Sequence, residues 1–232
     1  RHNSISSLLD VAAKTPRDKT CVSDRKKGGE SDWTGTASLD DALRFARYGG
    51  WEPQVATEFR DIFESHLPKL RSYVADELVE GRDVSGYEVD VAGYCIGEPE
   101  HMHEWLPAEN VINKRAFCVL IGHSINSGVS AEELFIRGQA VVALIRALAT
   151  MGYELEVWSE ETLGNWGDEY YTQLVCLHHA GEIMDQSAIE FSVGNPSWLR
   201  RILFAAEETE PMEIRNKFGF KEGSGYGSPK AP

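Results

Sequence analysis

Residues 116–158 constrain the fold of this chain more than any other stretch, because they contain a strand, a loop, a helix and a second strand in succession. The first six residues, AFCVLI, are all apolar, which is typical of a strand buried on both faces of a sheet. The loop GHSINSGVS that follows is mostly small and polar and cannot continue a core strand. The sequence therefore predicts a β-α-β unit whose first strand lies centrally in a sheet.

The helix of this unit is predicted over residues 131–151. Ser130 stands three residues before Glu133, the spacing at which a hydroxyl and a carboxylate cap the first turn of a helix. Apolar residues recur at helical spacing until Gly152, which stands where a left-handed C-terminal cap belongs. Gly138 lies on the apolar side, so we expect its missing side chain to let the helix approach the sheet closely.

Two more strands are predicted downstream of this helix. Residues 153–158 alternate between apolar and acidic side chains, which is typical of a strand with one face in water. Residues 170–177 (YYTQLVCL) form another strand candidate. The eleven residues between the two segments are compatible with either a hairpin or a parallel pair.

A last helix is predicted after Asn195, an N-cap residue that Pro196 follows at the first helical position. Its apolar stripe consists of Trp198, Leu199, Ile202, Leu203 and Ala206. Arg200 and Arg201 are consecutive and cannot share one narrow face of a helix. We therefore expect at least one of them to reach solvent or an acidic partner.

Composition bounds the class of protein. The chain has 232 residues and a formal net charge of −14, which favours solubility and disfavours broad wrapping around nucleic acid. Its four cysteines show no close pairing, which indicates a reducing compartment. No apolar run approaches the roughly 20 residues that cross a bilayer. We expect a soluble, cytoplasmic protein without a membrane partner or a cofactor.

Changes in composition divide the chain into four predicted parts. These are a flexible basic arm (1–32), a helical annex (33–82), an α/β domain (83–210) and a flexible Gly- and Ser-rich tail (211–232). Within the annex, Ser38 and Asp41 form a second capping pair before an apolar helix face. Two further helical segments are expected, over residues 54–66 and 69–80, with a break at Pro68.

Basic and aromatic residues near the two ends form a candidate surface for single-stranded nucleic acid, because cations and aromatic rings suit unpaired bases. The candidates are Arg25, Lys26, Lys27, Trp33, Trp51, Lys217 and Lys221. Each group also has a purely structural interpretation. The charged segments are also typical of solvated tails, and the two tryptophans that flank the short helix also suit packing against a core.

The region between the annex and the β-α-β unit contains a weak candidate metal site. Residues 87–94 alternate like a strand, and the acidic, aromatic segment 97–110 after them resembles a loop. Cys95, His101 and His103 are a chemically competent set of zinc ligands, although their spacing is unfamiliar. An exposed loop without metal is an equally natural interpretation.

The strand, its polar loop and the long helix resemble the opening of a von Willebrand factor A (vWA) domain, an open, doubly wound α/β fold. That family places a metal site in this loop, with the motif Asp-x-Ser-x-Ser. The corresponding positions here are Gly122, Ser124 and Asn126, and a glycine supplies neither the ligand nor the charge that a divalent cation prefers. The resemblance covers residues 116–201 and implies a vWA-like scaffold that works without its ion.

Three segments are also similar to an uncharacterised family of bacteriophage proteins: WTGTASLDDALRFARYGGW, RGQAVVALIRALATMGYELEVW and NPSWLRRILFAAEE. The common phosphate-loop, dinucleotide, zinc-protease and hydrolase motifs are absent from the sequence. The leading hypothesis is therefore a non-enzymatic phage module that recruits a protein partner through the loop residues Gly122, His123, Ser124, Asn126 and Ser127. The alternatives are a single-stranded DNA-binding cofactor of replication or transcription and a metal-dependent enzyme.

Overall fold

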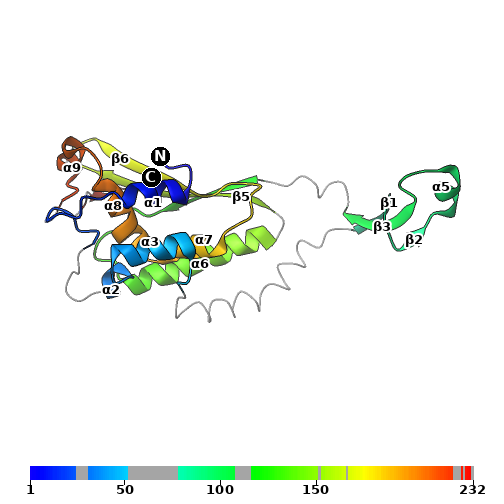
Figure 1. Ribbon diagram of the computed structural model, residues 1–232, viewed down its shortest axis with the longest axis horizontal. Helices are drawn as coiled ribbons and strands as arrows, with labels where there is room; N and C mark the ends of the chain where they lie inside the picture. Colours follow the sequence, from blue (N-terminus) through cyan, green and yellow to red (C-terminus); the bar gives the residue numbers. More distant parts are fainter. Residues whose placement is uncertain are drawn as a thin grey trace.

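The computed structural model describes residues 1–24, 31–51, 78–107, 116–150, 153–165, 167–221, 226 and 228–230. A main body consists of a sheet with helices packed on it, and a smaller unit of residues 78–107 stands apart from this body (Figure 1). The predicted helix 54–66 and most of the predicted helix 69–80 lie outside the described residues.

The sheet of the body has four strands of mixed orientation. These are β4 (Ala116–Gly122), β5 (Glu154–Gly164), β6 (Tyr170–His178) and β7 (Ser228–Pro229). Strands β4 and β5 are parallel, whereas β6 and β7 both run antiparallel to β5. The predicted α/β class is confirmed, and the connection between β5 and β6 is a hairpin rather than a crossover.

Strand β4 is confirmed as a strand, but its predicted central place is wrong. Among the described strands it pairs with β5 alone, at one end of the order β4-β5-β6. Phe117 and Leu120 are 41% and 53% exposed. The central strand is β5, which is longer than expected because it continues through Glu160 and Glu161 as far as Gly164.

Helix α6 (Ala131–Thr150) begins at the predicted capping pair. Ser130 Oγ accepts the Glu133 N–H at 3.1 Å, and Glu133 Oε2 accepts the Ser130 N–H at 2.8 Å. Gly138 does provide close packing, but against α7 (Gln186–Gly194) and not against the sheet. A Cβ at this position would collide with the Gly194 backbone. None of the described helices has the length and apolar character needed to cross a membrane.

The N-terminal residues belong to the body. Helices α1 (Ile5–Ala12), α2 (Ser31–Thr34) and α3 (Leu39–Tyr48) precede the unit 78–107 in the chain. The side chains of Leu8, Leu9 and Leu39 are buried in the same core as β5 and β6. The sequence predicted a flexible arm and a separate annex here, whereas the described parts of both segments help to bury the sheet.

The C-terminal region is also ordered around a core. The predicted helix after Asn195 is present as a π-helical turn, η2 (Trp198–Leu203), followed by α8 (Phe204–Glu207) and then α9 (Met212–Phe218). A second apolar cluster joins this region to β5 through Leu163, Phe218, Phe220 and Tyr226. Residues from 211 onwards were expected to form a flexible tail, but Phe218, Phe220 and Tyr226, which lie in the described part of this segment, pack against the sheet.

The unit 78–107 is a three-stranded antiparallel sheet with one short helix. Its strands are β1 (Leu78–Asp83), β2 (Glu88–Val89) and β3 (Met102–Pro107), in the order β1-β3-β2, and its helix is α5 (Val91–Ile96). Two predictions are wrong here. The expected strand 87–94 becomes a helix at Asp90, whose carboxylate caps Ala92 N and Gly93 N, and the expected loop 97–110 contains β3.

Candidate functional site

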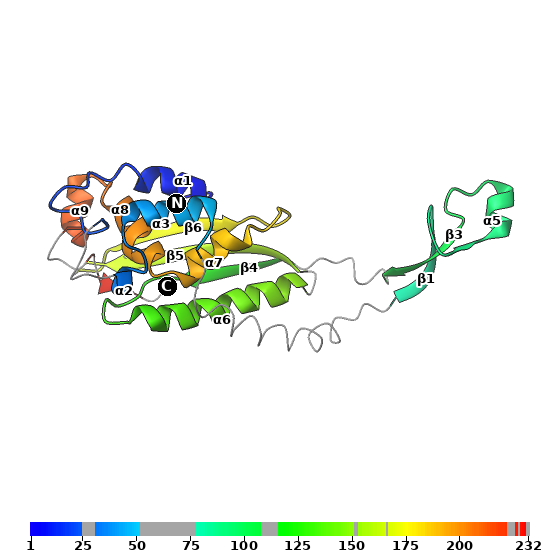
Figure 2. The same cartoon turned by 60° about the horizontal axis from the view of Figure 1, so that its bottom comes forward.

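The candidate site is the surface where β4 ends and α6 begins. The connecting loop, residues 123–130, lies at the carboxyl end of the parallel pair β4 and β5, a place where α/β folds commonly bind their ligands. Figure 2 shows α2 and α9 at this same end of the body. Of these two helices, α2 contacts the loop directly, through Trp33 and Ser127.

His123 is buried, and its ring joins the start of this loop to α7 and to β5. Its Nε2 contacts Ser192 O at 3.1 Å, and its Nδ1 contacts Ser159 Oγ at 3.0 Å. Nδ1 also lies 3.2 Å from Ile121 O, so each ring nitrogen faces a backbone carbonyl that can only accept; with the ring proton on Nε2, Ser159 Oγ, which accepts the Trp198 indole N–H, donates to Nδ1. Burial, aided by the charge of Arg137, lowers the pKa of His123 to about 4. The imidazole is therefore neutral near pH 7.

Two further bonds fasten the start of the loop. Ser124 Oγ accepts the backbone N–H of Thr162 on β5 at 2.7 Å. The guanidinium of Arg137 on α6 donates to Gly122 O at 2.6 Å. The Ser124 hydroxyl is thus engaged with the sheet, and no carboxylate stands at position 122, where the vWA motif would have its aspartate.

The tip of the loop faces solvent. Asn126 Oδ1 accepts the Gly128 N–H at 2.8 Å, which closes an Asx-type turn. Residues 126–128 are exposed. The indole N–H of Trp33 on α2 donates to Ser127 O at 3.0 Å. A half-buried aromatic ring therefore lies directly beside a tight polar turn.

Arg200 supports this ring from inside the body. Its guanidinium carbon lies 4.2 Å from the centre of the Trp33 ring, and its nitrogens donate to Trp33 O at 2.6 Å and to Val129 O at 2.5 Å. The side chain is only 2% exposed, and burial lowers its pKa to about 10. No carboxylate among the described residues pairs with it, so the expectation of a solvent or acidic partner is wrong for Arg200.

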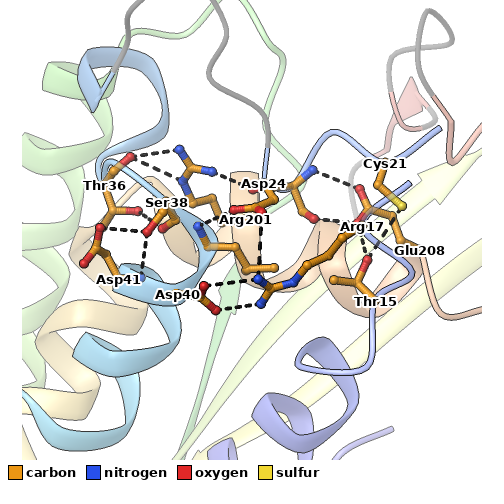
Figure 3. Close-up of polar contacts among 12 residues, drawn as sticks. Thr15, Arg17, Cys21, Asp24, Thr36, Ser38, Asp40, Asp41, Arg201 and Glu208 are labelled. Atoms are coloured by element: carbon orange, nitrogen blue, oxygen red, sulfur yellow. Dashed lines mark hydrogen bonds and ion pairs between the residues drawn. The ribbon is translucent and has the colours of Figure 1, made fainter. Parts of the chain in front are cut away.

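Arg201 is equally buried. Its hydrogen bonds join Ser23, which precedes α2 in the chain, to the end of α2 and the residues after it. It donates to Ser23 O at 2.7 Å, to Thr36 O at 3.0 Å and to Thr34 Oγ1 at 3.1 Å (Figure 3). Burial lowers its pKa, and the nearby charges of Asp24 and Asp41 oppose this effect. The two arginines bond different segments, as expected of consecutive helical residues, but backbone carbonyls and the Thr34 hydroxyl take the place of the expected water or acidic partner.

Glu208 joins both ends of the chain to the body. Its carboxylate accepts hydrogen bonds from Thr15 Oγ1 (2.7 Å), Val22 N (2.8 Å), Ser23 N (2.9 Å), Ser23 Oγ (2.5 Å) and Tyr226 OH (2.5 Å). Close by, Arg17 forms a two-bonded pair with Asp40, and this hydrogen bonding lowers the pKa of Asp40 (Figure 3). These contacts hold the residues that lead into the basic segment 25–27.

A buried pair of acids adjoins this region. Glu161 on β5 and Glu207 on α8 interact directly, yet no described N–H or O–H donates to Glu161 Oε2 or to either oxygen of Glu207. Burial raises the pKa of Glu161 to about 8 and that of Glu207 far above its ordinary value. A shared proton is what can join two such groups. This pair was not predictable from the sequence, because each residue belongs to a Glu-Glu doublet of the kind common on protein surfaces.

The whole chain, residues 1–232, matches the family model described as a domain of unknown function, DUF7192. The chain belongs to this family. No curated protein and no solved structure matches it.

The structure separates the predicted nucleic-acid residues of this family member. Trp33 lies at the loop, whereas Trp51 is stacked on Phe135, with ring centres 5.6 Å apart, which agrees with the packing alternative. Lys217 pairs with Glu169 at 2.6 Å, and Lys221 contacts Asn216. Arg25, Lys26 and Lys27 lie outside the described residues, in the connection that leads from Asp24 to α2.

The weak zinc candidates lie in the separate unit. Cys95 is exposed on α5. His101 Nδ1 contacts Glu98 O at 2.8 Å, and His103 Nδ1 lies 3.4 Å from Glu80 Oε1. Within the part of the chain that the structure describes, no three His, Cys, Asp or Glu side chains are grouped so that they could hold a metal ion. The zinc hypothesis stays a prediction, for which elemental analysis is the test.

Proposed function

We propose that the protein is a non-enzymatic binding module that recruits a partner protein into a protein or nucleoprotein complex of a bacterial virus, in the cytoplasm of its host. The observation that carries the proposal is the pairing of the exposed turn 126–128 with the Trp33 ring. Aromatic rings beside polar turns are frequent anchors of protein interfaces. A vWA-like scaffold, in which this loop is the contact surface, is part of the same proposal.

The internal bonding of the loop supports recognition rather than chemistry. His123 and Ser124, the residues with catalytic potential, are bonded to the sheet and to α7. What the loop offers to solvent is the exposed residues 126–128, beside the half-buried Trp33. Because buried Arg200 holds Trp33 and the loop together, a partner meets a preorganised surface and loses little entropy in ordering it.

Site-specific crosslinking tests the protein-recruitment proposal. Ser127→p-benzoylphenylalanine should yield a covalent protein adduct on irradiation in the native host. Tyr48→p-benzoylphenylalanine is the control, because Tyr48 is 78% exposed on α3, which lies outside the loop. An adduct at both positions, or at neither, would refute the proposed surface.

Metal titration tests the metal-free part of the proposal. We expect no binding of Mg²⁺, Mn²⁺ or Ca²⁺ at the loop, because Gly122 provides no carboxylate. Micromolar binding that is lost in Ser124→Ala would contradict a scaffold that works without its ion.

Single-stranded nucleic acid is the second candidate partner. Two observations favour it. Trp33, in α2, follows closely in the chain after the connection that carries Arg25, Lys26 and Lys27. Helix α9, which carries Lys217, lies at the same end of the body as α2 (Figure 2). Fluorescence anisotropy with labelled oligothymidylate tests it. Trp33→Ala should weaken binding, since stacking contributes roughly 1–3 kcal/mol per base, and Tyr48→Ala should not. Absence of binding at low salt would eliminate this candidate.

A further inference from the structure

Most of the apolar side chains that the structure describes between residues 80 and 104 are exposed. Among the side chains described in this unit, no apolar one larger than glycine is buried. Six are between 44% and 74% exposed: Val84, Tyr87, Val89, Val91, Tyr94 and Ile96. Exposed apolar side chains gathered in one small unit are typical of an interaction region. The body leaves this unit uncovered in both views (Figures 1 and 2).

Polar contacts and strand pairing help to hold the backbone of the unit in place. Arg82 bridges Asp90 at 2.5 Å and Glu98 at 2.8 Å, which ties β1 to both ends of α5. The Asp90 carboxylate also caps α5, and this bonding lowers its pKa. Tyr94 packs edge-on against His101 at 5.2 Å. The ordered unit therefore presents its apolar side chains on a defined scaffold.

The unit is also strongly acidic. Residues 80–104 contain seven acids, namely Glu80, Asp83, Glu88, Asp90, Glu98, Glu100 and Glu104, against a single Arg82. Since Arg82 is already engaged by two of these acids, the unit has a net excess of negative charge. Such a surface attracts cationic partners and repels polyanions.

We propose that residues 78–107 form a docking arm for a basic protein, which contacts Val91 and Tyr94 on one side of α5 and Ile96 at its carboxyl end on the other, and whose lysine and arginine side chains face the surrounding acids. This surface is separate from the loop 123–130 and does not depend on the function proposed there. The negative charge of the arm determines which class of partner can bind to it. Nucleic acid is repelled, and a second copy of this chain carries a net charge of −14 itself.

The chain's own segments adjoining the arm are poor candidates for covering it. Residues 52–77 and 108–115 together contain seven acids and five lysines or arginines, so they also have an acidic excess. A basic partner gains electrostatic attraction at the rim and apolar burial at the centre, the usual anatomy of a specific interface.

The test uses the full chain and a synthetic peptide of alternating lysine and leucine as the probe. A peptide of alternating glutamate and leucine is its matched control. Calorimetry should show binding of the lysine peptide alone, and hydrogen exchange should show protection confined to residues 84–96. The triple variant Val91→Ser, Tyr94→Ser, Ile96→Ser should weaken binding by about tenfold or more, since each lost 1.4 kcal/mol is a factor of ten.

Two comparison variants keep the test decisive. Leu144→Ser with Ile183→Ser removes exposed apolar side chains from the body and should leave the affinity unchanged. Glu88→Gln with Glu100→Gln keeps every apolar side chain and should reduce both the affinity and its salt dependence. Because this charge variant retains Asp90 and Arg82, it tests the arm even where the serine variant loses its fold.

Three outcomes would overturn the proposal. The first is undiminished binding by a triple variant whose β3 amides remain protected. The second is equal binding of the glutamate peptide. The third is concentration-dependent dimerisation of the wild type that the triple variant lacks, which would identify a second copy as the occupant. Each differs from a failure of the loop surface, because the arm variants leave Trp33 and Ser127 intact.

Discussion

Glu161 on β5 and Glu207 on α8 meet inside the body, where their side chains are only 1% and 0% exposed. Two negative charges in contact and away from water would be strongly unfavourable, so the folded state retains a proton on the pair. Burial raises the pKa of Glu161 to about 8, and burial together with the charge of Glu161 raises that of Glu207 well above its ordinary value. The carboxyl groups of the unfolded chain have ordinary pKa values. The unfolded chain therefore loses these protons at a lower pH than the folded chain does.

This difference sets the sign of one pH effect on stability. Between the ordinary carboxyl pKa, near 4.5, and about pH 8, the folded state holds more protons than the unfolded state. The contribution of the pair is therefore fully present below the lower value and decreases as the pH rises through the window. Urea denaturation at about pH 5 and about pH 9 measures it, provided that a variant isolates it from other carboxyl groups.

Glu207→Gln is that variant. The amide cannot ionise and can donate to Glu161, so we expect the free energy of unfolding near pH 9 to increase by about 1–3 kcal/mol. The decrease between mildly acidic and alkaline pH should also become shallower than in the wild type. A variant that is less stable than the wild type at alkaline pH would contradict the shared proton.

Glu208→Gln should have the opposite effect, although the two glutamates are adjacent. Five donors from Thr15, Val22, Ser23 and Tyr226 converge on the Glu208 carboxylate. An amide turns an NH₂ group toward some of these donors and weakens the rest, so we expect a loss of about 2–4 kcal/mol at neutral pH. Thermal unfolding of the two glutamine variants side by side provides the comparison, and equal shifts would refute it.

Gly138→Ala should destabilise the body through a backbone collision. A Cβ at Gly138 would lie 2.8 Å from Val193 O and would also overlap the Gly194 Cα, so α6 and α7 would have to move apart. Overpacking of this kind costs typically about 1–3 kcal/mol, more than alanine's better helix propensity returns.

Gly122→Ala is the control for this substitution. A Cβ at Gly122 would meet no atom within 4 Å, so its melting temperature should stay near that of the wild type. If Gly138→Ala melts at or above the wild-type temperature, the contact between α6 and α7 is wrong.

Local signals predicted structure well where all the partners lie within one helical turn. The Ser38–Asp41 and Ser130–Glu133 caps are present as expected, because the spacing alone brings their atoms together. Signals that depend on distant partners failed. The apolar run of β4 indicated a central strand, although its neighbours leave Leu120 exposed.

Charged residues misled the prediction of the interior in the same way. The predicted strand ended at Trp158, before Glu160 and Glu161. Strand β5 continues through both residues, and the hairpin with β6 and the packing of α8 bury them. At the candidate site, the loop position was predictable from the change in polarity. The stack of Arg200 on Trp33 was not, because the two residues are 167 positions apart.

Arg200→Met should release the loop and α2 together. The methionine fills part of the space but leaves Trp33 O and Val129 O without their donor, and a buried carbonyl that loses its partner costs about 1–3 kcal/mol. We expect the free energy of unfolding to decrease by about 2–4 kcal/mol in total, with faster hydrogen exchange at residues 31–34 and 127–130.

Arg137→Met is the matched control, because this exposed arginine makes one bond to Gly122 O and should contribute less than about 1 kcal/mol. Equal losses in the two variants would show that burial of Arg200 beneath Trp33 adds nothing to the rigidity of the surface.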